Sequence, residues 1–140
     1  MAVMRKHTLG LSGTTVPLPC FFPSVSSVKT NLLPVDYIEL LSAVAHPLYL
    51  VSAYDIAGSC SEHQQRIDCA LKQSRTKGSA VLLDSGNYEG FWKGATDWSA
   101  ERFHIISSAY EYDIGFCLSP SPLSRQKTCW FKVHSICLHG

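Results

Sequence analysis

The stretch that decides the fold is Ala80-Val81-Leu82-Leu83-Asp84-Ser85-Gly86-Asn87-Tyr88-Glu89-Gly90-Phe91. Four apolar residues in a row are typical of a strand that is buried on both faces of a sheet. This strand ends on Asp84, and a hydroxyl and a glycine follow directly. Because α/β proteins place their chemistry at the carboxyl ends of such strands, Asp84 is the first candidate for a functional carboxylate.

The same stretch has a plainer interpretation as a turn, since Asp, Ser, Gly and Asn all favour turns. In that case Asp84 and Ser85 only shape the backbone, and Tyr88 packs in the core. Gly86 fits both interpretations, because glycine allows a sharp turn or a close approach to a ligand. The rest of the chain has to decide between them.

The composition predicts a single domain. The chain has 140 residues, of which 46% are apolar and 16% charged, with a net charge of +1. That charge favours neither nucleic acid nor a membrane surface. No apolar run reaches the roughly 18 residues of a membrane span, and the first ten residues lack the apolar core of a signal peptide. Six scattered cysteines are typical of small buried side chains in a reducing compartment, so we expect a cytoplasmic protein without membrane contact.

Strand and helix patterns alternate along the chain. We expect a short hairpin or an entry loop over 7–19 and strands over 20–25, 48–52, 80–83 and 114–118. Helices are expected over 34–45, over 61–77 and from a cap at Asp97 or Ser99 to about 110. Ser61 opens a sequence with the form of a capping box. The alternation predicts an α/β fold with parallel strands and helical crossovers, which is half of an eight-stranded barrel or most of a small doubly wound sheet.

The last 27 residues differ in composition, because they contain no Asp or Glu and a Ser-Pro-Ser-Pro break at 119–122. We therefore expect a folded part over 1–118 and an irregular tail over 119–140, part of which does not belong to the fold. A chain that stops halfway through a repeating architecture looks truncated. The tail carries zinc-ligand residue types at a spacing that structural zinc sites do not use, so we predict no metal; they are Cys129, His134, Cys137 and His139.

Several blocks follow one another in the order of a known family. Residues 16–25 match a strand of the type T-P-x-F-x-P-V, and 28–34 match a lysine-containing loop with a proline-started helix. Residues 52–56 are a loose counterpart of N-T-Y-H-L, and 84–89 match D-S-G-G-F/Y-Q at Asp, Ser, the first Gly and the aromatic. Over about residues 8–118 the chain resembles the N-terminal half of the tRNA-guanine transglycosylase family.

The resemblance implies the first half of a TIM-type (β/α)8 barrel with its site at the carboxyl strand ends. It implies exchange of guanine for a deazaguanine base in tRNA, or in DNA, through a covalent intermediate between an enzyme aspartate and the ribose. Asp84 would contact the base and move a proton, with Ser85 bonding the same base and Tyr88 stacking on it. Tyr54 and Asp55 would line the same mouth.

The chain also departs from the family pattern. Asn87 and Glu89 replace a glycine and a glutamine, and Asp55 replaces a histidine, so base recognition could differ. The family's nucleophile and zinc blocks have no counterpart among the matched blocks, so we expect no cofactor here and no turnover by this chain alone. Two alternatives stay open: a non-catalytic half-barrel that binds a ligand or forms an oligomer, and a small doubly wound nucleotide-binding domain, which would lack its glycine-rich loop.

An aromatic loop follows the deciding stretch, with Phe91, Trp92 and Trp98 around Lys93. This mixture of rings and a basic group could suit RNA. The simpler expectation is that the rings pack over the rim of the barrel.

Overall fold

The computed structural model describes residues 7–11, 14–28, 30–116 and 136–137. Its elements, in chain order, are β1 (His7–Leu11), β2 (Thr14–Leu18), β3 (Ser24–Val25), α1 (Pro34–Ala43), β4 (Leu48–Ser52), α2 (Ala53–Ala57), α3 (Ser61–Thr76), β5 (Ala80–Asp84), α4 (Asn87–Trp92), α5 (Ala100–Ala109), β6 (Ile114–Gly115) and β7 (Ile136–Cys137).

A parallel sheet forms the centre of the molecule, with strand order β3-β4-β5-β6. Each neighbouring pair is parallel, and β4 and β5 pair along their whole length, from Leu48 opposite Ala80 to Ser52 opposite Asp84. The predicted α/β class with parallel strands is confirmed, and the strands are adjacent in sequence order.

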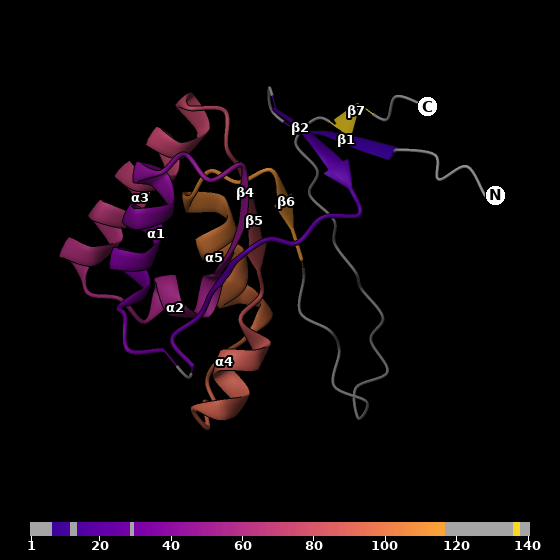
Figure 1. The fold of residues 1–140 in the computed structure, drawn as a ribbon. Coiled ribbons are helices and arrows are strands. Elements are labelled where there is room, and N and C mark those ends of the chain that lie inside the picture. The colour runs from indigo at the N-terminus through magenta and orange to yellow at the C-terminus, as the bar shows by residue number, and fades with distance from the viewer. Residues whose placement is uncertain (1–6, 12–13, 29, 117–135, 138–140) are drawn as a thin grey trace, which may run out of the picture.

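The helices cover one face of this sheet (Figure 1). Tyr49 and Val51 of β4 and Val81 and Leu83 of β5 point to that face, where they pack with buried residues of α1, α2, α3 and α5. The reason is the strand order: successive crossovers of the same hand, made without a reversal, keep these four helices on the same side. A doubly wound sheet would reverse its order and carry helices on both faces.

The β1–β2 hairpin covers part of the opposite face, beside the amino ends of the strands (Figure 1). Leu11 and Val16 pack there against Leu48, Ala80 and Leu82. The hairpin is extended by β7, which pairs antiparallel with β1. The predicted hairpin over 7–19 is therefore confirmed, and the structure leaves the carboxyl edge of the sheet uncovered by it.

Two predicted boundaries and one predicted helix cap were wrong. The predicted strand over 20–25 is only two residues long, since Pro23 cannot donate to a ladder. The predicted helix over 34–45 ends at Ala43, and Ala45 adopts a left-handed φ of 50° that breaks a helix. The capping box at Ser61 does not form, because Cys60 is the N-cap residue and no side chain caps the helix.

Of the two caps that the sequence offered for α5, Asp97 and Ser99, the structure uses Ser99, whose hydroxyl accepts the backbone N–H of Arg102. The short helices α2 and α4 were not predicted, because five or six residues are too few to show a helical period.

The expectation that the cysteines are buried is wrong for three cysteines of the described residues: Cys60 and Cys69 are exposed, and Cys20 is partly exposed. Within the described ranges, no helix combines the length and apolar character needed to cross a membrane.

Replacing Leu11 by Ala tests whether the hairpin belongs to the folded unit. Leu11 is fully buried against the sheet, so we expect the free energy of unfolding to fall by about 2–5 kcal/mol. Leu40→Ala on α1 is the matched control, because Leu40 is exposed and surface changes stay within about 0.5 kcal/mol. Chemical denaturation measures both; equal stabilities would mean that the hairpin does not pack on the sheet.

Candidate functional site

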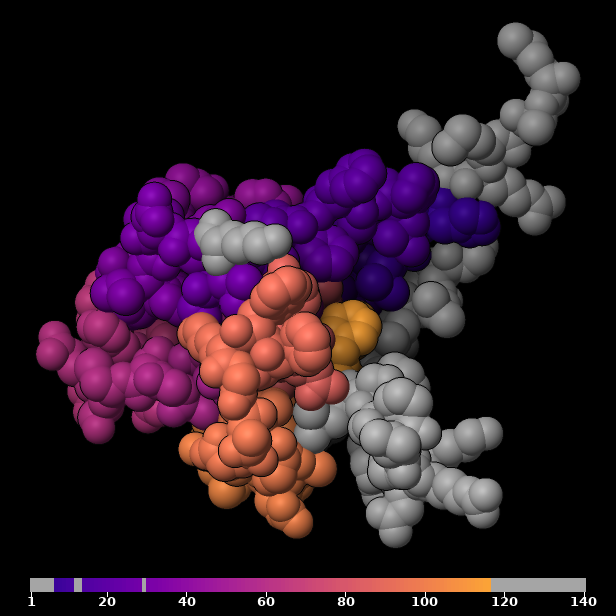
Figure 2. All heavy atoms as spheres, turned by 90° about the horizontal axis from the view of Figure 1, so that it is seen from below, coloured from indigo at the N-terminus to yellow at the C-terminus, as the bar shows by residue number. Residues whose placement is uncertain are grey.

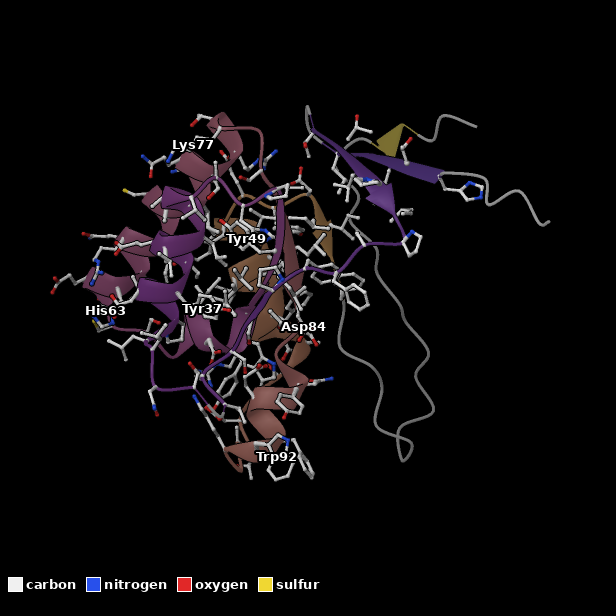
Figure 3. All side chains as sticks on the ribbon, viewed as in Figure 1. Tyr37, Tyr49, His63, Lys77, Asp84 and Trp92 are labelled. Atoms are coloured by element: carbon white, nitrogen blue, oxygen red, sulfur yellow. The ribbon has the colours of Figure 1, made fainter. Side chains whose placement is uncertain are left out.

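Polar side chains gather where β3, β4 and β5 end, at one edge of the sheet. Asp84 is the last residue of β5 and lies opposite Ser52, the last residue of β4. Ser26 and Ser27 follow β3 directly. Figure 3 shows Asp84 at the foot of the sheet, above α4. The parallel arrangement brings these ends together, as the sequence predicted for parallel strands.

Glu89 of α4 ties two of these strand ends together. Its side chain is buried, with 4% of the residue exposed. Ser26 donates to one carboxylate oxygen at 2.6 Å, and Ser52 donates to the other at 3.1 Å. A buried carboxylate is costly unless it is hydrogen-bonded. The two serine hydroxyls satisfy it and fix α4 against the ends of β3 and β4.

Asp55 of α2 makes a second link to the segment after β3. Its carboxylate accepts the backbone N–H of Ser27 at 2.7 Å and also the Ser27 hydroxyl. Lys93, at the end of α4, hydrogen-bonds the same hydroxyl and lies 3.5 Å from Asp55 Oδ1. Burial raises the pKa of Asp55 and the negative charge of Glu89 adds to this, whereas the bonds from Ser27 and the charge of Lys93 oppose it.

Asp84 is the least engaged of the three carboxylates. It is half-buried and accepts the backbone N–H of Gly86 at 2.9 Å, and it forms no ion pair within the described residues. Burial raises its pKa, and the charge of Glu89 raises it further. A half-buried carboxylate whose pKa is raised holds a proton more readily than an exposed one, which suits a group that exchanges a proton with a ligand.

Gly86 lets the turn after β5 lie directly on the start of α2. Its φ is +80°, and a Cβ placed there would lie 2.3 Å from Tyr54 Cβ and 2.8 Å from Ser52 Oγ. Only glycine fits this contact. The structure therefore brings Tyr54 and Asp84 to neighbouring strand ends, at the same edge.

The other proposed binding residues lie beside this turn. Ser85 is buried, and its carbonyl accepts the indole N–H of Trp98 at 2.9 Å. Trp98 packs edge-on against Tyr54, with ring centroids 5.3 Å apart. Tyr88 is 50% exposed, so it does not pack in the core as the plain-turn interpretation required.

The expectation that the aromatic loop packs over the rim holds for Trp98 and is wrong for the other two rings. Phe91 is 78% exposed and Trp92 is 56% exposed. The expectation is wrong for Phe91 and Trp92 because α4 buries the polar side chain of Glu89 and exposes these two rings.

Sequence reasoning missed three serines that hold the site together: Ser26, Ser27 and Ser52. Glu89 was noticed only as a departure from a family pattern, and Lys93 only as a basic group beside the aromatic rings. A signal was available, because serines stand at or directly after the ends of three successive strands. Serine hydroxyls at converging strand ends are natural partners for a buried carboxylate.

No group of three or more His, Cys, Asp or Glu side chains in the described residues could hold a metal ion. Most of the cysteine- and histidine-rich tail, including Cys129, His134 and His139, lies outside the described residues. Comparisons with models of protein families, with curated proteins and with solved structures found no match.

Gly86→Ala should destabilise the protein strongly, because the added Cβ collides with Tyr54 and the φ is left-handed. We expect the free energy of unfolding to fall by about 2–5 kcal/mol. Gly78→Ala is the control: Gly78 has a similar φ of +84° but nothing within 4 Å of a Cβ, so only the backbone strain of about 1 kcal/mol remains. Thermal melting compares them, and equal losses would contradict the close contact.

Asp84→Asn should change how stability depends on pH. The pKa of Asp84 is raised above its ordinary 3.8, so between that value and the raised pKa the folded state binds more protons than the unfolded state. Stability therefore falls as the pH rises through this window. The asparagine side chain does not ionise, so the variant should lack this fall in stability. Its free energy of unfolding should match that of the parent below about pH 4 and be no lower than that of the parent at pH 7.

Denaturation of both proteins across this pH range measures the difference, with Asp97→Asn as a control on an exposed carboxylate. A variant that is less stable than its parent only at neutral pH would reverse the sign and show that ionised Asp84 stabilises the fold.

Proposed function

We propose that this chain forms the base-binding part of a transglycosylase that exchanges guanine for a deazaguanine base in tRNA or DNA. One observation carries the proposal. Asp55 and Glu89 are occupied by serines and a lysine, whereas Asp84 keeps an unpaired charge at the same edge within the described chain. A carboxylate left free between two occupied ones is available to a ligand.

Guanine suits this carboxylate chemically. Its N1–H and its exocyclic amine are two donors side by side, and a carboxylate is a pure acceptor with two oxygens. Hydrogen bonds to a charged partner are about twice as strong as neutral ones. The raised pKa of Asp84 also suits a group that moves a proton on the base as it is exchanged.

We further propose that the sheet is the first half of a TIM-type barrel. The sequential strand order and the placement of the helices on one face support it. The hairpin packs at the amino ends of β4 and β5, on the face that would line the barrel, and leaves the carboxyl edge with Asp84 open. TIM barrels carry their sites at that edge.

The proposal assigns base recognition to this chain and cleavage of the glycosidic bond to an aspartate that none of the matched blocks contains. A cytoplasmic location is part of it, in keeping with the free thiols of Cys20, Cys60 and Cys69. The second candidate function, a binding module without catalysis, rests on the same observation, that the matched blocks do not contain this nucleophile.

Titration calorimetry with guanine and 7-deazaguanine tests the proposal, with adenine as the ligand that lacks the paired donors. Asp84→Asn should weaken guanine binding by about 10- to 100-fold, the loss expected for a charged hydrogen bond. Asp97→Asn, on an exposed residue paired with Arg102, should bind like the parent. If the Asp84 variant bound guanine as tightly as the parent, Asp84 would not be the residue that binds the base.

Incorporation of labelled guanine into tRNA separates the two candidates. We expect base binding without exchange when the chain is assayed alone, and exchange only when the rest of a barrel is supplied. Exchange by the chain alone would show that it holds its own nucleophile, and would rule out the binding module.

A further inference from the structure

The central sheet has an unpaired edge at each end. Within the residues that the structure describes, β3 pairs with β4 alone and β6 pairs with β5 alone. The outer side of an end strand carries backbone N–H and C=O groups that another strand can pair with. Each of these end strands is only two residues long, so a partner would need side-chain contacts as well as backbone pairing.

The helix beside β3 has an apolar flank that no described helix covers. Glu39 of α1 faces α3, where Arg66 binds it at 2.6 Å. Leu33, Tyr37 and Val44 share a side of α1 that lies roughly 140° around the helix from Glu39. Leu33 and Val44 are 52% and 63% exposed. An uncharged flank of this kind is typical of a helix that packs against a further helix.

The other end of the sheet carries exposed apolar side chains as well. α5 leads into β6, and it buries Ile106 but exposes the neighbouring Ile105. Phe116, directly after β6, is also exposed, and its backbone N–H donates to Leu83 O at 2.8 Å, which holds it beside β5. Strands and helices of a closed barrel have neighbours on both sides, and each end of this sheet lacks one within the described chain.

The layers of the molecule match one sector of a barrel. Seen from the carboxyl edge of the sheet, α1 and α3 lie on one side and the β1–β2 hairpin on the other (Figure 2). Leu82 packs on the hairpin side, and side chains alternate along a strand, so Asp84 points to the same side as Leu82. In a barrel this side is the interior and the helices form the outer ring.

A second copy of the chain fits the two unpaired edges. Placing β6 of one copy beside β3 of its partner continues the parallel strand order, and brings α5 of that copy to the apolar flank of the partner's α1. Such a contact joins two different surfaces, so it ends only when the copies close into a ring. Four strands from each copy make eight, the number at which parallel strands with outer helices close into a barrel.

We propose that two copies of this chain associate edge to edge, with β6 of each copy beside β3 of its partner, into one closed eight-stranded barrel. The carboxyl edges of both copies then meet at one mouth, so the partner covers the side of the candidate site that a single copy leaves open. The inference rests on the barrel part of the proposed function. It takes nothing from Asp84 as the residue that binds the base.

Sedimentation equilibrium of the full chain from about 1 to 100 μM tests the association. We expect an assembly of twice the 15.5 kDa of one chain, with no growth beyond it, because a closed barrel has no free edge. The mass of one chain at every concentration would overturn the proposal. Assemblies that keep growing with concentration would overturn it too, since their edges would not have closed.

Val44→Glu tests the apolar flank of α1. Val44 is exposed in a single copy, so the fold tolerates the change, whereas a charge buried in the contact should weaken association by about 100-fold or more. Gln65→Glu adds the same charge at an exposed position of α3, outside the contact, and should associate like the parent. If Val44→Glu associated as tightly as the parent, the flank would lie outside the contact and the barrel would be wrong.

Hydrogen exchange distinguishes a closed barrel from other dimers. On association we expect slower amide exchange in residues 20–28 and 110–116, which contain β3 and β6, and in α1. Slower exchange in α1 and β3 without β6 would show a symmetric contact through one end of the sheet, and would contradict the barrel.

Guanine titration on the same samples separates this inference from the proposed function. Asp84→Asn should associate like the parent, because β5 is an inner strand of the sheet. Association without guanine binding would refute only the assignment of Asp84, and guanine binding by a single copy would refute only the association.

Discussion

Two buried carboxylates, Asp55 and Glu89, hold the ends of the first strands together, and the rest of the site depends on them. β3 is only two residues long and pairs with β4 alone, so its ladder is too short to fix the segment that follows it. Glu89 and Asp55 bind Ser26 and Ser27 and so attach that segment to α4 and α2. Hydrogen bonds to charged groups contribute about 1.5–3 kcal/mol each, and they reduce the cost of burying the two carboxylates.

The same arrangement determines what Asp84 can do. With its neighbours occupied, Asp84 is the carboxylate at this edge that keeps capacity for a ligand. Its burial, and to a smaller extent the nearby charge of Glu89, makes its ionisation less favourable. The fold therefore carries a group whose charge opposes stability at neutral pH. Such an unfavourable residue is common where a protein has a functional site, because function and stability place different demands on one position.

The sequence predicted the parallel sheet and most of the helices because their signals are local. The apolar run 80–83 predicts a strand, and the proline before Val35 predicts the start of a helix, each from neighbouring residues alone. The structure confirms both elements. The links from Ser26 to Glu89 and from Ser27 to Asp55 join residues 63 and 28 positions apart, and no local period encodes them. The outward rings of α4 were missed for the same reason, since their direction follows from the serines that bind Glu89.

Carboxylate-resolved NMR tests the central claim, that Asp84 is the one carboxylate of the three left free for a base. The side-chain carbon signals of Asp55 and Asp84 would be followed over pH with and without guanine. Donors from a bound base favour the ionised form, so guanine should lower the titration midpoint of Asp84 and leave that of Asp55 unmoved. A midpoint for Asp84 that guanine does not change, or a shift at Asp55 in its place, would contradict the claim.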